Sequence, residues 1–169
     1  PKFDLISMMA HSEATQNLPL REFIGTFGLL IVGGNDTTRN SMTGGLMAMI
    51  EHPAEVAKVR ADAALLPTLV SETIRYQTPV IHMRRTATRD AELAGKAIAR
   101  GDKVVMWYVS GNRDETAMEE PERFFVGRAK PRHHLAFGAG IHRCVGDRLA
   151  EMQLRILWEE LLKRDLAIE

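Results

Sequence analysis

Cys144, the only cysteine in the sequence, lies in the segment FGAGIHRCVG, just before a stretch predicted to be an amphipathic helix. Backbone N–H groups and the helix dipole at such a position favour a negatively charged sulfur, which makes the thiol a competent metal ligand. Gly138, Gly140 and Gly146 permit tight turns and let a large, flat group approach the backbone closely. The segment is therefore a candidate site for a ligand bound through sulfur.

Four interpretations of this cysteine are open on the residues alone. A cysteine before a helix is most often a small buried hydrophobic side chain. Zinc is a second candidate, although the segment lacks a C-x-x-C or H-x(3-5)-H pair of the usual spacing. A nucleophilic thiolate would need a histidine held beside it, and His142 on the same loop is poorly placed for that. Ligation of a haem iron needs one thiolate only, and it also explains the glycines. The zinc candidates are His133, His134, His142 and Cys144.

A second group that could take part in chemistry consists of an acidic and a basic side chain on one helix face. The segment SETIRY places Glu72 and Arg75 three residues apart. On a surface such a pair contributes only about 0–1 kcal/mol. A buried, bidentate pair is directional and costly to lose, so a buried pair would position the cysteine loop and would not react itself.

A third group interrupts a long apolar run, where GGNDTTRN follows FIGTFGLLIV. Two glycines in a helix interior cost roughly 1 kcal/mol each against alanine, and threonine can bond back to a carbonyl one turn earlier. The segment therefore predicts a helix that is locally widened at a carboxylate and a hydroxyl. A tolerated weak point or a helix-packing notch is the simpler explanation on these residues alone. The side chains that share this face or its edge are Leu29, Val32, Gly33, Asp36 and Thr37.

The elements that must position these groups follow from periodicity and from Pro, Gly and Asn signals. We predict a mainly α-helical protein with a small β-sheet, an α+β arrangement. Residues 111–134 are polar and rich in turn residues, which predicts a long ordered loop fixed by tertiary contacts. An amphipathic helix begins near the start, with Phe3, Ile6 and Met9 on one face. The other predicted helices cover about 20–50, 53–63, 67–76 and 145–163, and the strands cover 84–88, 91–93, 96–99 and 103–107.

Length and composition limit the possible classes. A chain of 169 residues with 45% hydrophobic residues fits one domain or part of a larger one. Lys plus Arg (22) balance Asp plus Glu (22), so overall charge indicates no nucleic-acid or membrane-surface partner. The apolar runs are too short to cross a bilayer, so no transmembrane segment is expected. One cysteine excludes an intrachain disulfide and favours a reducing, cytoplasmic location.

At this point the residues resemble a known family, the cytochrome P450 haem-thiolate monooxygenases. SETIRY is similar to the family's E-x-x-R motif, and GGNDTT is similar to its oxygen-binding motif, (A/G)-G-x-(D/E)-T-T. The resemblance covers nearly the whole chain. It implies the C-terminal part of the P450 fold, with the long oxygen-site helix, the E-x-x-R helix, short strands, the cysteine loop and the following helix. The haem-binding signature is matched at Phe137, Gly138, Gly140, His142, Cys144 and Gly146, with histidine where arginine is more frequent.

The resemblance also implies a role for each motif residue. Cys144 would be the axial ligand of a haem b iron, as in the Cys-ligated haems that favour O–O cleavage. Thr37 would hydrogen-bond the oxygen, and Asp36 would relay protons from solvent. Arg123, in the segment EEPERF, would join Glu72 and Arg75 as a third charged member. The remaining haem contacts would be Phe137, Gly138, Gly140 and Gly146, with His142 and Arg85 (or Arg84 in its place) at the propionates; substrate would face Leu29, Val32, Gly33, Ile81 and Met83.

Longer strings, among them LLIVGGNDTTRNSMTGG, resemble the bacterial alkane hydroxylase branch of the family. This implies insertion of one O2 oxygen into an unactivated C–H bond, by terminal hydroxylation of medium-chain alkanes or fatty acids. Electrons would come from NADH through a ferredoxin reductase and a ferredoxin. A basic cluster would receive the acidic ferredoxin. Its members are Arg128, Lys130, Arg132, His133, His134 and Arg143.

Proteins of this family are more than twice as long as this chain. We therefore expect residues 1–169 to be one segment of a single monooxygenase domain, without the N-terminal half and the last C-terminal hairpin. Such a segment would expose apolar surface and bind haem weakly or not at all by itself. The alternatives are a non-catalytic fragment and, from another class, a helical zinc or thiol protein.

Overall fold

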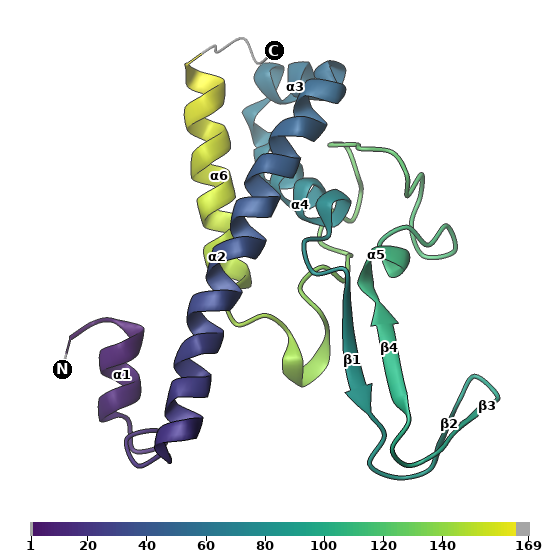
Figure 1. Cartoon of the computed structure of the whole chain (residues 1–169). Helices are drawn as coiled ribbons and strands as arrows, with labels where there is room; N and C mark the ends of the chain where they lie inside the picture. Colours follow the sequence, from purple (N-terminus) through teal and green to yellow (C-terminus); the bar gives the residue numbers. More distant parts are fainter. Residues whose placement is uncertain (1, 165–169) are drawn as a thin grey trace. The chain divides into compact units, whose positions relative to one another are not determined.

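A computed structural model of the chain describes residues 2–164 (Figure 1). These residues form two compact units, whose boundary lies between Thr37 and Thr38 inside a long helix. Among residues 2–164, no helix combines the length and the apolar character needed to cross a membrane.

The first unit contains α1 (Leu5–His11) and the first half of α2 (Leu20–Glu51). Asp4 caps α1, because its side chain accepts a hydrogen bond of 2.7 Å from the backbone N–H of Ser7. Both predicted helices are confirmed, although Phe3 lies before α1 and is fully exposed.

The predicted widening of α2 is wrong, because the helix is α-helical from Leu20 to Glu51 without interruption. Thr37 does bond back, from its hydroxyl to the carbonyl of Gly33 at 2.8 Å. This bond is added to the helical ladder and does not replace it. Added β-carbons at Gly33 or Gly34 would meet no atom within 4 Å, so these glycines are not a packing notch within the described residues.

The second unit begins with the remainder of α2 and holds the other elements. The predicted helices and strands are present, with ends that differ by at most two residues, and the mainly α-helical fold with a small β component is confirmed. The short helical turns α5 (Tyr108–Gly111), η1 (Ala63–Leu65) and η2 (Gly140–His142) were not predicted as separate elements, because three or four residues carry no periodicity. The elements are α3 (Pro53–Ala61), η1 (Ala63–Leu65), α4 (Leu66–Gln77), β1 (His82–Thr86), β2 (Ala91–Leu93), β3 (Lys96–Ile98), β4 (Lys103–Trp107), α5 (Tyr108–Gly111), η2 (Gly140–His142) and α6 (Asp147–Lys163).

The strands form two separate antiparallel pairs rather than one sheet. β1 pairs with β4, with Arg84 opposite Val105, and β2 pairs with β3 as a short hairpin. The chain leaves β4 directly into α5, so the β1–β4 pair ends beside the beginning of the long loop (Figure 1). Helix α6 begins at Asp147, later than predicted, because Gly146 is its N-cap residue.

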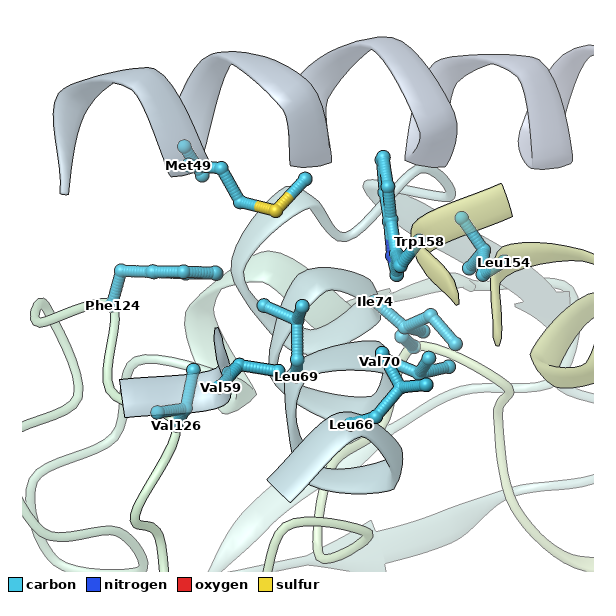
Figure 2. Packing of buried hydrophobic residues seen from close by; sticks show 12 residues of the cluster. Met49, Val59, Leu66, Leu69, Val70, Ile74, Phe124, Val126, Leu154 and Trp158 are labelled. Carbon is cyan, nitrogen blue, oxygen red and sulfur yellow. The ribbon is translucent and has the colours of Figure 1, made fainter. Parts of the chain in front are cut away.

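The hydrophobic core lies where α4 packs against α6 (Figure 2). Trp158 of α6 and Leu69 of α4 are completely buried, and a fully buried apolar side chain of this size contributes about 1.5–3 kcal/mol. An added β-carbon at Gly45 of α2 would lie 2.5 Å from Thr73 Cγ2 and 2.8 Å from Trp158 Cζ2. Only glycine therefore lets this part of α2 approach α4 and α6 so closely.

The segment between α5 and η2 is the predicted long ordered loop. Two of its residues, Phe124 and Val126, are completely buried in the core cluster shown in Figure 2. Burial of these apolar side chains explains how 28 residues without a helix or strand can keep one conformation (residues 112–139).

Candidate functional site

The cysteine loop, defined here as residues 135–146, is closed by its own backbone. Cys144 N–H donates to the Phe137 carbonyl at 2.9 Å, and Gly138 N–H donates to the Leu135 carbonyl at 2.8 Å. Gly138 and Gly140 have φ angles of +70° and +66°, a backbone conformation that residues with a β-carbon rarely adopt. The prediction that these glycines permit tight turns is confirmed.

The two glycines with positive φ face different surroundings. A β-carbon at Gly138 would lie 3.3 Å from the Tyr108 hydroxyl and 3.6 Å from the His142 carbonyl, so glycine lets the loop pack against α5. A β-carbon at Gly140 would meet no atom within 4 Å. The backbone at Gly140 is therefore open to close approach from outside the described chain.

The surface around Cys144 fits a large apolar group. The thiol is exposed, which contradicts the interpretation of Cys144 as a buried hydrophobic side chain. Its neighbours Ile141 and Val145 are 96% and 91% exposed. Large apolar side chains that stand together at a surface usually mark a ligand or partner. A sulfur donor beside an open glycine and apolar side chains fits a haem held by a thiolate ligand.

The zinc alternative lacks its ligands. Within residues 2–164 there is no group of three or more His, Cys, Asp or Glu side chains placed to hold a metal ion. His134 is buried, whereas Cys144 is exposed. A tetrahedral site of the usual kind needs four such ligands, so this set does not support zinc.

Glu72 and Arg75 form a bidentate ion pair inside the protein. Arg75 Nε donates to Glu72 Oε2 and Arg75 Nη2 donates to Glu72 Oε1, both at 2.8 Å, and both side chains are 0% exposed. Burial alone would raise the pKa of the Glu72 carboxyl. Hydrogen bonds from Arg75 and Arg128 outweigh this effect and hold the pKa below its ordinary value. The carboxylate is therefore charged and acts as a fixed anchor.

The third charged member of this cluster is Arg128, and the prediction of Arg123 is wrong. Arg128 Nε and Nη2 donate to Glu72 at 3.0 and 3.1 Å, and the residue is almost completely buried. The Arg123 side chain is 47% exposed and pairs instead with Glu120 at 2.9 Å. Only its backbone carbonyl meets the cluster, as an acceptor from Arg75 and Arg128.

The ion-pair cluster fixes the long loop through backbone groups. Arg75 Nη1 donates to the carbonyls of Asn112 and Pro121 at 2.8 and 2.7 Å. Glu72 Oε1 accepts from the N–H of Phe125 at 2.9 Å. A second buried carboxylate, Glu55 of α3, accepts from the N–H of Val126 at 3.1 Å. The sequence carried no signal for Glu55, because an acid in the first turn of a helix is ordinary.

His134 and Arg128 do not belong to an exposed docking face, so the predicted basic cluster is wrong for these two residues. Lys130, Arg132, His133 and Arg143 are exposed. Two of these exposed cations pair with acids, Arg132 with Glu151 and Arg143 with Asp147, each at 2.9 Å.

His134 predicts a loss of stability in mild acid. Burial, followed by repulsion from Arg143, Arg75 and Arg132, lowers its pKa from 6.5 to about 4. Between these values the unfolded chain binds a proton that the folded protein excludes. The free energy of unfolding should therefore fall as pH decreases from about 7 to 5. The total loss should approach about 3 kcal/mol near pH 4.

Urea titrations at several pH values test this expectation. The dependence above pH 5 should largely disappear in His134→Phe and persist in His133→Gln, which changes the exposed neighbour. An unchanged pH dependence in His134→Phe would contradict the assignment.

The remaining predicted residues lie on two elements. Asp36, Leu29, Val32 and Gly33 are on the exposed surface of α2 in the first unit, and Thr37 is half-buried there. In the second unit, Ile81 precedes β1, while Met83 and Arg85 lie on it, all exposed; Arg85 Nη1 donates to the Arg84 carbonyl at 3.1 Å. His142 is exposed and ends η2 within the cysteine loop.

The described residues include two hollows that none of the predicted substrate residues lines. One, of about 270 Å³, lies between α4 and α6. The other, of about 340 Å³, lies between α1 and α2 within the first unit. The first is lined by Pro67, Val70, Ser71, Arg132, Arg148, Glu151, Met152 and Arg155.

Comparison with known proteins decides the family. Residues 3–164 match the family described as Cytochrome P450. The chain belongs to the cytochrome P450 family. The cysteine loop and the buried Glu72–Arg75 pair described above are therefore those of a P450 chain.

The relatives include enzymes with named activities. Linalool 8-monooxygenase of Pseudomonas putida is 47% identical over 165 residues, which cover 97% of this chain and 40% of the relative. Methyl-branched lipid omega-hydroxylase of Mycobacterium bovis is 42% identical over 164 residues, 95% of this chain and 38% of the relative. This P450 chain thus spans about 40% of the length of these relatives.

A solved structure, Cytochrome P450-153 from Novosphingobium aromaticivorans, is similar to this chain with a TM-score of 0.92 and 55% sequence identity. The match covers 98% of this chain and 43% of that one. The fold described here is therefore a P450 fold over nearly its whole length.

Proposed function

We propose that this chain is part of a haem-dependent monooxygenase, in which Cys144 is the axial ligand of a haem b iron. The observation that carries the proposal is the exposed Cys144 sulfur on a loop that is open at Gly140 and flanked by exposed apolar side chains. When bound, such a haem supplies the activation of O2 for insertion into a C–H bond.

The cysteine loop would hold the haem with little reorganisation. The bond between the N–H of Cys144 and the carbonyl of Phe137 already fixes the backbone of the ligand residue. Phe137, Gly138, Gly140 and Gly146 would contact the ring, and His142 and Arg85 would donate to its propionates. For the chain of 169 residues alone we propose weak haem binding, because the loop contributes only one side of a complete pocket.

Asp36 and Thr37 are the proposed groups for proton delivery. A threonine hydroxyl has one donor and two acceptor positions, so it can pass on a proton while it stays in a hydrogen-bonded chain. Asp36 is exposed, which suits a group that takes protons from solvent. Thr37 is half-buried one residue further along the helix.

The proposed reaction is terminal hydroxylation of medium-chain alkanes or fatty acids. The side chains proposed to face the substrate, Leu29, Val32, Ile81 and Met83, are apolar and exposed, and an alkyl chain needs such partners. The name of one relative, an omega-hydroxylase of methyl-branched lipids, supports attack at a chain end. Gly33 would leave room for the substrate and oxygen.

The proposed electron donor is a ferredoxin, reduced by NADH through a ferredoxin reductase. Lys130, Arg132, His133 and Arg143 form the exposed part of the basic cluster, and opposite charge would speed the encounter with an acidic carrier. We also propose a cytoplasmic enzyme without a nucleic-acid partner.

Product analysis tests this function. The segment is grafted into the corresponding part of a full-length relative and supplied with ferredoxin, reductase, NADH, O2 and octane. We expect 1-octanol as the main product and a loss of about 10²-fold or more in Thr37→Ala, the magnitude usual for a proton-transfer group. A graft that binds haem but forms only internal alcohols would reject the terminal assignment.

A further inference from the structure

Asn112 is a buried polar residue in the first turn of the long loop, and every group of its amide is used. Its side chain is 0% exposed. Its Oδ1 accepts from the N–H of Leu135 at 2.6 Å, and its Nδ2 donates to the Thr78 hydroxyl at 2.9 Å. Its backbone carbonyl accepts from Arg75 Nη1 at 2.8 Å. The residue thus contacts the end of α4, the ion-pair cluster and the cysteine loop at once.

We infer that Asn112 is a positioning residue that links the buried Glu72–Arg75 ion pair to the loop carrying Cys144. The consequence for haem binding rests on the proposed function, whereas the link itself is a property of the folded chain. Asn112 stands outside the cysteine, E-x-x-R and oxygen motifs.

The contact with Leu135 fixes the beginning of the cysteine loop. The Leu135 carbonyl accepts from the N–H of Gly138, and the Phe137 carbonyl accepts from the N–H of Cys144. These two hydrogen bonds connect the beginning of the loop to Cys144 near its end. The Leu135 side chain also covers Gly111, where an added β-carbon would lie 2.6 Å from Leu135 Cδ1. Leu135 therefore meets the end of α5 through its side chain and Asn112 through its backbone.

The opposite end of the Asn112 amide is fixed by Thr78. Thr78 ends α4 with a φ of 43°, and its hydroxyl donates to the Arg75 carbonyl at 2.6 Å. The same hydroxyl oxygen accepts from Asn112 Nδ2. A buried amide that lost either partner would leave an unpaired polar group, which costs about 1–3 kcal/mol.

Asparagine is the side chain that these contacts require. They need one acceptor and one donor on a single short planar group. Aspartate keeps the acceptor for Leu135 and loses the donor to Thr78, while alanine loses both. The two substitutions therefore separate the link to the cysteine loop from the link to α4.

Hydrogen exchange of backbone amides, measured by NMR on the full chain without haem, tests the inference. In the wild type we expect the N–H of Leu135 to be protected to a similar degree as core amides such as that of Leu154. In Asn112→Ala, exchange of the amides of Leu135, Gly138 and Cys144 should accelerate relative to the wild type. This acceleration should exceed any acceleration at Leu154 by a factor of about ten or more. In Asn112→Asp this excess should stay below about threefold, because the acceptor for Leu135 remains.

Asn17→Ala, which removes the same amide from an exposed position, serves as the matched control and should change none of these rates. An equal acceleration of all amides would show a purely structural role and overturn the inference. So would an equal effect of aspartate and alanine on the three loop amides. If Asn112→Ala does not fold, an unprotected Leu135 amide in the wild type would overturn the inference by itself. None of these outcomes depends on haem, so failure here is distinct from failure of the proposed function.

Discussion

Replacing Glu72 by glutamine is expected to lower the free energy of unfolding by about 3–5 kcal/mol, because it leaves two buried guanidinium groups without a carboxylate. Both Arg75 and Arg128 donate to this side chain, which is completely buried. A typical domain has only about 5–15 kcal/mol of stability in total. The change should therefore shift the urea midpoint strongly or abolish folding at pH 7.

An exposed ion pair of the same chain gives the matched control. Glu159 accepts from Arg155 at 2.9 Å on the surface of α6, with side chains 31% and 60% exposed. Glu159→Gln should cost less than about 1 kcal/mol. The free energy of unfolding of both variants is measured by urea denaturation followed by circular dichroism. Equal losses would show that burial does not increase the contribution of the Glu72 cluster to stability.

The second large effect distinguishes two arginines of the long loop, Arg128 and Arg123. Arg128→Ala removes both bonds to Glu72 and also bonds to the carbonyls of Glu119, Glu120 and Arg123, and should cost about 3–5 kcal/mol. Arg123→Ala removes a half-exposed side chain, which pairs with Glu120 at 2.9 Å and lies 3.6 Å from Glu55, and it should lower the urea midpoint far less. Urea midpoints of the two single variants give the comparison. A larger loss in Arg123→Ala would restore the assignment made from the sequence.

Local patterns explain why so much of the fold was predictable. Helix α4 and helix α6 follow from apolar spacing over several turns, and each strand follows from a short alternating run between turn residues. The turn at Cys144 was predictable because its glycines act on their own backbone. The ion pair of Glu72 and Arg75 is likewise local, since three residues separate its members.

Contacts between residues far apart in the chain could not be predicted from local sequence patterns. Arg123 and Arg128 lie in one loop without periodicity, so their spacing could not indicate which one points inward. Glu55 meets a residue 71 positions away, and Asn112 meets Leu135 across 23 positions. Each looks like an ordinary surface residue in sequence, and only the packing of the loop around the core makes it internal.

The error in α2 has a different cause. The glycine and threonine preferences that predicted a widened helix are each worth about 1 kcal/mol or less. A helix of 32 residues has a continuous ladder of backbone bonds, and its second half packs through Gly45 against Thr73 and Trp158. The ladder outweighs the local preferences, and the threonine bond is accommodated within it.

The proposed function depends on ligation of haem iron by the sulfur of Cys144. Its most direct test is the absorption spectrum of the reduced, CO-treated protein, with the segment grafted into a full-length relative. Ligation by Cys144 predicts a Soret band at the long-wavelength position of thiolate-ligated haem, and loss of that band in Cys144→Ser. A graft without the band, or a serine variant that keeps it, would contradict the account.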